Sequence, residues 1–200
     1  MASQVRHSVR GARREQTRQR ILGAAIAEFK RSGMGAADVA AIVAAAGVAH
    51  GTFYFHFPTK EHVLLELENR EEARMATEFA RFLGEDHDLK ATLTKVVQLV
   101  TGLEERLGAT LCKELLALHF SPSRPYADDW TDHPVVVLLV RELERARRDV
   151  VVHPDVDVFF TATFFLLGIY GVLTTTDSRG SRATLLTGLI TTAMHGLGAR

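Results

Sequence analysis

The sequence of 200 residues is long enough for one large or two small domains, and its 46% hydrophobic and 24% charged residues are typical of soluble globular proteins. A single cysteine, Cys112, excludes an internal disulfide framework and favours a reducing compartment, so we expect a cytoplasmic protein. The net charge is zero, but residues 1–60 carry nine lysines and arginines against three acidic residues, an excess that the rest of the chain balances. This asymmetry favours a basic surface that faces a polyanion, with a solvated basic tail as the alternative.

Residues 1–14 are interpreted as a basic arm. Arginines stand where a secretory signal would need an apolar run of about seven residues or more, so export by that route is not expected. The arginines that precede the first apolar stripe are Arg6, Arg10, Arg13, Arg14, Arg18 and Arg20. Such a cluster of positive charges is suited to a polyanionic partner.

Three helices are predicted within a helix-turn-helix domain at residues 15–62. An amphipathic stripe predicts a helix over residues 15–31, and a second stripe predicts one over residues 39–46, with Asp38 as its cap and Gly47 just past its end. The third helix begins near Ala49 and ends before Pro58, because the residue before a proline disfavours helical geometry. Three short helices with a glycine turn between the second and third have the outline of a helix-turn-helix unit.

The remaining residues, 63–200, are predicted to form a second helical domain. A long helix starts after Thr59 and meets no helix-breaking residue before Gly84, which gives about 36 Å at 1.5 Å per residue. Further helices are predicted at 89–107, 109–120, 135–149, 154–176 and 182–196, and a proline-rich loop at 121–134. The β-branched runs at 135–140 and 150–153 are possible strands, but no alternating pattern of any length is present. The predicted fold class is therefore all-α.

The uncharged run from Val158 to Thr176 has about the length of a membrane span. It contains five threonines and two glycines, and it follows two acidic residues, Asp155 and Asp157. A buried or interface helix is favoured over a transmembrane one, and no membrane partner is expected.

Residues 49–57 separate into three faces when they are placed on a helix at 100° per residue. Phe53 and Phe57 share the face that would pack on the first two helices. The other two faces carry hydrogen-bonding side chains, and Phe55 lies between them. The second face holds His50, Gly51 and Tyr54, and the third holds Thr52, His56 and, beyond the proline, Lys60. Such a helix is suited to enter the major groove of DNA, with its flanks on the phosphates.

A metal site is not expected on this helix. His50 and His56 are six residues apart, whereas two ligands on one helix face need a spacing of three or four. No Ser/His/Asp set and no pair of carboxylates can be argued from spacing, so neither catalytic residues nor a cofactor are expected.

The run from Thr17 to Leu67, above all "AGVAHGTFYFHFPTKEHVLLEL" at residues 46–67, resembles the DNA-binding domain of the tetracycline-repressor-like (TetR) family of bacterial transcription regulators. The resemblance implies that His50, Gly51 and Tyr54 face bases and that Thr52, His56 and Lys60 hold phosphates. It also implies a homodimer on double-stranded operator DNA and a small-molecule inducer, with residues 63–200 as the ligand-binding and dimerisation domain. By the same resemblance, the arginines at the N-terminus are expected to reach the backbone or the minor groove of DNA. The sequence departs from the family at Ala37-Asp38 and at Ala49, where hydroxyl side chains are usual.

Aromatic and polar residues beyond residue 70 are either core residues or the lining of a cavity for an apolar or aromatic inducer of unknown identity. The candidates for this lining are Phe79, Phe82, His119, Phe120, Tyr126, Trp130, Phe160, Thr163 and Phe164. Cys112 is interpreted as a core residue.

The last two helices offer flat apolar faces that would form a four-helix bundle between two subunits. The residues of these faces are Thr161, Leu166, Leu167, Gly168, Gly171 and Val172, followed by Leu186, Leu189, Ile190, Ala193 and Leu197. A two-fold dimer also matches a palindromic operator. The favoured function is a ligand-released repressor; the alternative is an all-α enzyme or a ligand-binding protein that does not regulate transcription.

Overall fold

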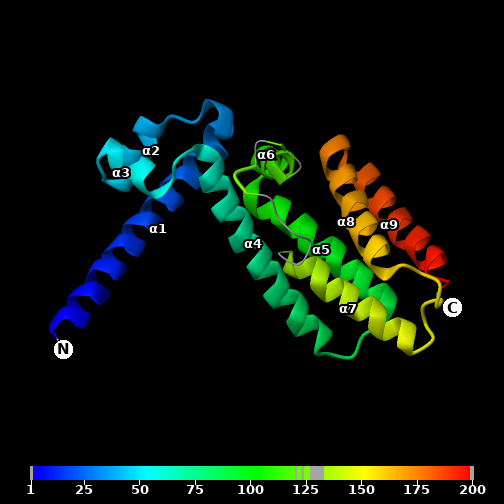
Figure 1. Ribbon diagram of the computed structural model, residues 1–200. Coiled ribbons are helices and arrows are strands. Elements are labelled where there is room, and N and C mark those ends of the chain that lie inside the picture. The colour runs from blue at the N-terminus through cyan, green and yellow to red at the C-terminus, as the bar shows by residue number, and fades with distance from the viewer. Residues whose placement is uncertain (1, 120, 123, 127–132, 199–200) are drawn as a thin grey trace. The chain divides into compact units, whose positions relative to one another are not determined.

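The computed structural model describes the backbone of residues 2–119, 121–122, 124–126 and 133–198, and the side chains from residue 11 onward within those ranges. The described residues form nine α-helices and no strand, which confirms the predicted all-α fold (Figure 1). The helices are α1 (Ala2–Ala36), α2 (Val39–Ala46), α3 (His50–His56), α4 (Lys60–Leu83), α5 (Leu89–Leu107), α6 (Ala109–His119), α7 (Pro134–Arg148), α8 (Val158–Thr175) and α9 (Arg179–Gly196).

The chain divides into two compact units. The first unit comprises residues 1–69 and 107–125, and therefore combines α1 to α3, the start of α4, and α6. The second unit comprises residues 70–106 and 126–200, with the rest of α4 and helices α5, α7, α8 and α9. Helix α4 contributes to both units, and α6 belongs with the DNA-binding candidates although it follows them by some fifty residues.

Helix α1 is longer than the stripe over residues 15–31 predicts. It runs back to Ala2, because the segment before residue 15 contains no proline and has four arginines, which favour helices. The expected arm thus continues the first helix. At the other end, Gly33 has non-helical φ 78° and ψ 155°, so the last residues of α1 are offset from the rest.

The core of the first unit forms from the residues that carried the predicted stripes. Ile21, Leu22 and Phe29 of α1 are fully buried, as are Ile42 of α2 and Leu64 of α4. Burial of each such side chain stabilises the fold by roughly 1.5–3 kcal/mol. These contacts hold α2 against α1, and α2 packs in turn against α3.

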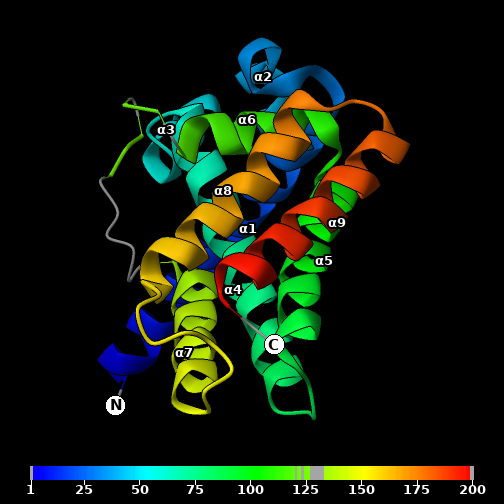
Figure 2. The same ribbon diagram turned by 90° about the vertical axis from the view of Figure 1, so that its right-hand side faces the viewer.

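In the second unit, α8 and α9 lie side by side in both views (Figure 2). A Cβ on Gly168 would lie 2.8 Å from Leu189 Cδ1, so the two helices approach so closely there that only glycine fits without a shift. Leu166, Leu186 and Leu197, which the sequence placed on a subunit interface, are buried within the chain. Part of the predicted interface face therefore serves the packing of this unit.

The two runs that the sequence left as possible strands are not strands. Residues 135–140 lie within α7, and residues 150–153 form a turn and bends after it. Val150 has φ 61°, in the left-handed region, where it follows the C-terminal cap of α7. Helix α8 is long and apolar enough to cross a membrane by length and composition alone, a property that core helices of soluble proteins share, and a third of it is buried.

Candidate DNA-binding site

A glycine turn joins α2 to α3. Gly47 has φ 63° and ψ 44°, and its N–H donates to Ala44 O at 3.1 Å while the N–H of Val48 donates to Val43 O at 3.0 Å. This pair of bonds is the Schellman arrangement, in which a glycine beyond the last turn satisfies the free carbonyls of the helix. The two helices are bent by 95° at the turn, as expected for a helix-turn-helix unit. The predicted role of Gly47 is confirmed.

Both ends of α2 are bound by charged side chains. Asp38 Oδ1 accepts a hydrogen bond from the N–H of Ala40 at 2.8 Å, which confirms the predicted cap. At the other end, the guanidinium of Arg20 donates to Ala46 O and, at 3.2 Å, to Gly47 O. Arg20 therefore ties α1 to the turn between α2 and α3, a role that its place in the basic segment did not reveal.

Helix α3 is anchored by its two predicted inward residues. Phe53 and Phe57 are fully buried, and their ring centroids lie 6.2 Å apart. Ala49 takes the cap position of α3 without a side-chain hydrogen bond, as the loss of a hydroxyl at this position implies. The helix depends on its two phenylalanines, since no cap stabilises its start.

The predicted base-facing residues lie on the exposed surface of α3. His50 and Gly51 are exposed, and 47% of Tyr54 is accessible. The rings of His50 and Tyr54 lie 5.4 Å apart, so the structure brings these two residues together on one face. Hydrogen-bonding groups on both rings could reach the base edges of a major groove.

Phe55 is the most exposed large apolar residue of α3, with 67% of its surface accessible. The guanidinium carbon of Arg14 lies 5.1 Å from the centre of its ring, in a cation–π arrangement. Arg18, one turn further along α1, lies in the same way 4.2 Å from the Phe57 ring. Two arginines of the basic segment therefore lie against the last turn of α3.

His56 differs from its expected place on the flank of α3, because only 8% of it is exposed. Burial lowers the pKa of its imidazole below the ordinary value, and the positive charges of Arg14 and Arg18 lower it further. Its carbonyl accepts a hydrogen bond from Arg18 Nη1 at 2.7 Å. The helical phase could not predict this burial, because α1 supplies the cover.

The other two residues of the third face are Thr52 and Lys60. Thr52 is half-buried. The ammonium group of Lys60 donates to three carbonyl oxygens at and just past the end of α1, those of Met34 at 2.7 Å, Gly35 at 3.0 Å and Ala37 at 3.3 Å. A lysine ammonium has three N–H donors. A phosphate contact of Lys60 would therefore replace one of these bonds.

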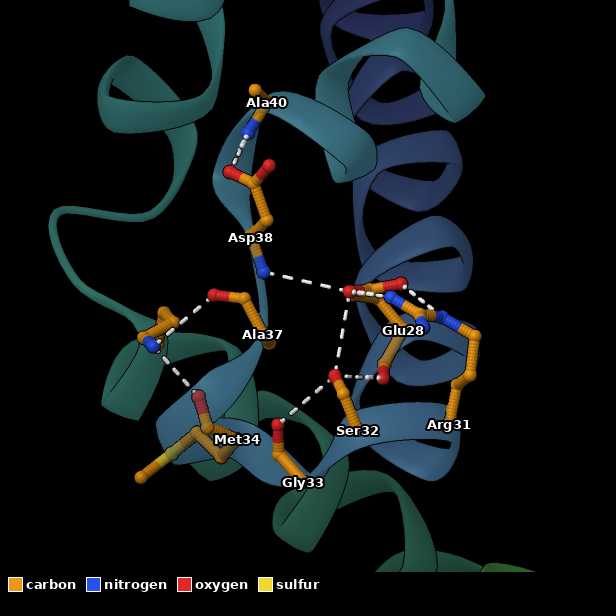
Figure 3. A network of polar contacts seen from close by, with 9 residues as sticks. Glu28, Arg31, Ser32, Gly33, Met34, Ala37, Asp38 and Ala40 are labelled. Carbon is orange, nitrogen blue, oxygen red and sulfur yellow. Dashed lines mark hydrogen bonds and ion pairs between the residues drawn. The ribbon is translucent and has the colours of Figure 1, made fainter.

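The connection between α1 and α2 carries a dense polar network (Figure 3). Glu28 accepts hydrogen bonds from the guanidinium of Arg31 at 2.6 and 2.9 Å and from the hydroxyl of Ser32 at 3.3 Å. The bonds from Arg31 lower the pKa of the Glu28 carboxyl, because they favour its charged form. The backbone N–H of Asp38 also donates to Glu28, at 3.4 Å. This network fixes the start of α2 relative to the end of α1.

Several residues of the site escaped the sequence reasoning. Arg14 and Arg18 are four residues apart and so lie on one face of a helix. This spacing could have predicted that both contact α3. The roles of Arg20 and Glu28 depend on the packing of α1 against α2. Arg20 and the contact of Glu28 with Asp38 have no local sequence signal, whereas the bonds of Glu28 to Arg31 and Ser32 span only three and four positions.

The described candidates for an inducer cavity differ widely in exposure. Phe79 is fully buried, and Tyr126 is 62% exposed. Phe160 and Phe164 are both more than half exposed and stack on each other, with ring centroids 4.1 Å apart. Phe120 and Trp130 lie outside the described residues. The hydroxyl of Thr163 is buried and makes no hydrogen bond.

An open groove of about 440 Å³ lies between the end of α4 and the start of α5. Among the described candidates, Phe82 alone lines it. The other lining residues are Asp88, Lys90, Ala91, Thr94, Lys95 and Gln98.

His119 is bound instead to a buried carboxylate of the first unit. Its Nδ1 lies 2.6 Å from Glu68 Oε1, and Arg124 Nη1 donates to Glu68 Oε2 at 2.6 Å. Within the described part of the chain, no three histidine, cysteine or acidic side chains gather as a metal site would require.

Residues 21–67 match the family model of bacterial regulatory proteins of the tetR family. No curated protein matches the sequence. Among solved structures, Salmonella enterica GusR is 27% identical with a TM-score of 0.65, and the match covers 92% of this chain and 96% of that one. The Thermus thermophilus repressor FadR in complex with lauroyl-CoA is 22% identical with a TM-score of 0.70, over the same shares of the two chains.

A third similar structure is RolR in complex with resorcinol, which is 16% identical with a TM-score of 0.66 and covers 95% of this chain and 91% of that one. The family match spans α2, α3 and the glycine turn, where the exposed and buried faces described above lie, and the similar folds extend over nine-tenths of the chain. Over residues 21–67 this chain is therefore similar to the tetR family of bacterial regulatory proteins.

Proposed function

We propose that the protein is a cytoplasmic, homodimeric transcriptional regulator that binds a palindromic operator through α3 and is released from it by a small molecule, and thus acts as a repressor. The observation that carries the proposal is the exposed pair His50 and Tyr54 on a helix whose opposite face is fully buried. A rigidly seated helix that presents polar rings to solvent is what direct reading of base edges requires.

In this proposal His50, Gly51 and Tyr54 read bases in the major groove. Gly51 has no atom within 4 Å of the position of a Cβ, so its surface is open to a close approach by the edge of a base. Phe55 lies beside this face and is exposed enough to contact a thymine methyl group.

The phosphates on either side are held by the flanks of α3. Thr52, His56 and Lys60 are the proposed contacts, and Arg14 joins them because its guanidinium lies exposed beside Phe55. His56 is neutral at ordinary pH given its lowered pKa, so it would donate a neutral hydrogen bond. Most of the electrostatic attraction then falls to arginine and lysine.

We propose α8 and α9 as the subunit interface, through the face that they leave exposed. Phe160, Phe164 and Leu167 are 57%, 55% and 38% exposed and follow one another on α8 at spacings of four and three. Leu185 on α9 is 48% exposed. Exposed apolar patches of this kind mark interaction sites. One recognition helix reads only half of a palindrome, so a dimer of this kind also suits operator binding.

An apolar or aromatic small molecule is the proposed inducer. FadR and RolR, to which this fold is similar, are solved with lauroyl-CoA and resorcinol, and a Bacillus subtilis FadR with stearoyl-CoA. These ligands support a small organic effector for this chain without selecting between an acyl-CoA and a phenol. The effector acts by binding more tightly to the arrangement that does not fit DNA, and helix α4, which contributes to both units, transmits the change.

Selection of binding sites from a random pool of double-stranded DNA tests the proposal. We expect enrichment of a palindrome whose half-sites are about one helical turn apart. A pool that stays random after several rounds, while the protein remains folded, would contradict it. An enzyme or a ligand-binding protein without a regulatory role would give that result.

A further inference from the structure

The segment from Gly33 to Ala37 joins the long part of α1 to α2, so its position sets where the helix-turn-helix unit lies relative to α1. Lys60 at the start of α4 binds the carbonyl side of this segment, as described above. Its N–H side is bound by a residue that lies eighty positions further along the chain, Glu114 of α6.

Glu114 directs both carboxylate oxygens at one backbone group. Its Oε2 lies 2.8 Å and its Oε1 3.0 Å from the backbone nitrogen of Met34. A hydrogen bond to a carboxylate is about twice as strong as one between neutral groups. Met34 is therefore held on its N–H by α6 and on its carbonyl by α4.

Gly33 makes room for this contact. A Cβ at this position would lie 2.9 Å from Glu114 Oε1, and the φ of 78° is itself one that residues with side chains rarely adopt. The helical path of α1 is broken at the residue where the α6 carboxylate approaches. The break and the carboxylate therefore depend on each other. In an unbroken helix the Met34 N–H would donate to a carbonyl of the helix itself and would not be available to Glu114.

We infer that Glu114 is a positioning residue for DNA binding, through which the state of α6 is coupled to the turn between α1 and α2 and so to the recognition helix. The inference rests on the proposed function. In the proposed function, α4 transmits the effect of the small molecule. The contact between Glu114 and Met34 would be a second connection, which does not involve α4. Displacement of α6 would release the Met34 N–H and free the turn, and DNA that fixes the turn would in return stabilise α6, because coupling between two sites is reciprocal.

Hydrogen exchange followed by NMR and mass spectrometry tests the inference, with the palindrome selected by the wild-type protein as the probe. In the free protein we expect the Met34 amide to exchange about tenfold faster or more in Glu114→Ala than in wild type, because a charge-assisted bond is lost. In wild type, DNA should slow exchange in residues 109–119. In Glu114→Ala, DNA should protect α3 as before but leave α6 unchanged.

Three further variants separate the contact from general stability. Glu114→Gln keeps an oxygen acceptor and should keep the transmitted protection, whereas Glu114→Asp keeps the charge, withdraws it by one methylene and should lose the protection. Thr110→Ala, an exposed change on the same helix, should behave as wild type. If Glu114→Ala does not fold, the comparison of Glu114→Asp with Glu114→Gln still tests the inference.

The inference would be overturned if DNA slowed hydrogen exchange in α6 of Glu114→Ala or Glu114→Asp as much as it does in wild type. So would an α6 that DNA does not protect even in wild type. A wild-type protein that selects no DNA sequence would instead refute the proposed function, and the two failures are therefore distinct.

Discussion

The guanidinium of Arg14 lies 5.1 Å from the centre of the Phe55 ring and so places a positive charge of α1 beside the exposed surface of the recognition helix. The two residues are 41 positions apart in the sequence, and each is exposed to solvent. The pair extends the proposed DNA surface from α3 onto α1.

Replacement of Arg14 by glutamine should weaken binding to all DNA sequences alike. The loss of one phosphate contact should reduce the slope of log affinity against log salt concentration by about 0.9. Fluorescence anisotropy across a salt series measures the slope. Arg81→Gln, an exposed arginine near the end of α4, is the matched control and should leave the slope unchanged.

Tyr54→Ala should have the opposite signature. Loss of a base contact should cost about 1–3 kcal/mol on the selected palindrome and little on unrelated DNA, with the salt slope kept. Tyr54 is half exposed, so the free energy of unfolding should change little. Phe53→Ala, on the buried face, should instead destabilise the domain by roughly 3–5 kcal/mol. Equal losses on both kinds of DNA in Tyr54→Ala would show that this residue does not read bases.

His56 should make the stability of the first unit depend on pH. Its pKa is lowered in the folded state, chiefly by burial, so below the ordinary histidine pKa the unfolded chain takes up a proton that the folded chain does not. Stability should therefore fall as the pH falls through the ordinary value toward the lowered one. Urea unfolding at pH 7.5 and 5.5 should show a smaller difference in His56→Gln than in wild type. His50→Gln, at an exposed position, should retain the wild-type difference.

Val150→Gly should stabilise the second unit by about 1 kcal/mol, because a β-branched residue in the left-handed region is strained and glycine is not. The side chain is 85% exposed, so its removal gives up little packing. Chemical denaturation measures the change. Val151→Gly is the control and should destabilise slightly, and a loss of stability in Val150→Gly as well would contradict the account of this turn.

Phe164→Glu should separate the subunits. The substitution places a charge on the exposed stripe of α8 that the proposed dimer would bury, and an unpaired buried charge is strongly unfavourable. Sedimentation velocity should give a dimer for wild type and a monomer for the variant. Val151→Glu adds the same charge at an exposed apolar residue outside α8 and α9 and should remain a dimer. If Phe164→Glu remained a dimer, the subunit interface would lie elsewhere on the protein.

Much of the fold could be predicted because its signals are local. Asp38 and Gly47 mark the two ends of α2 through hydrogen bonds to residues within four positions. Phe53 and Phe57 lie on one face because they are four residues apart on a helix. Whatever depends on another helix could not be predicted. The burial of His56 requires α1, and the Glu114 contact joins residues that are eighty positions apart.

The faces of the last helices show the same division. Periodicity identified α8 and α9 as apolar, but it could not say which apolar residues pack within the chain. Leu166 and Leu186 lie inside, whereas Phe160 and Phe164 lie outside, because α7 and α9 cover one side of α8.

The measurement that tests the central claim most directly is the affinity of the wild-type protein for its selected palindrome and for a scrambled duplex of equal length, at one salt concentration. Reading of bases by α3 predicts binding to the palindrome about a thousandfold tighter or more, and a ratio that shrinks in Tyr54→Ala. Equal affinity for the two duplexes would contradict it, since that result leaves only the charge of the N-terminal region.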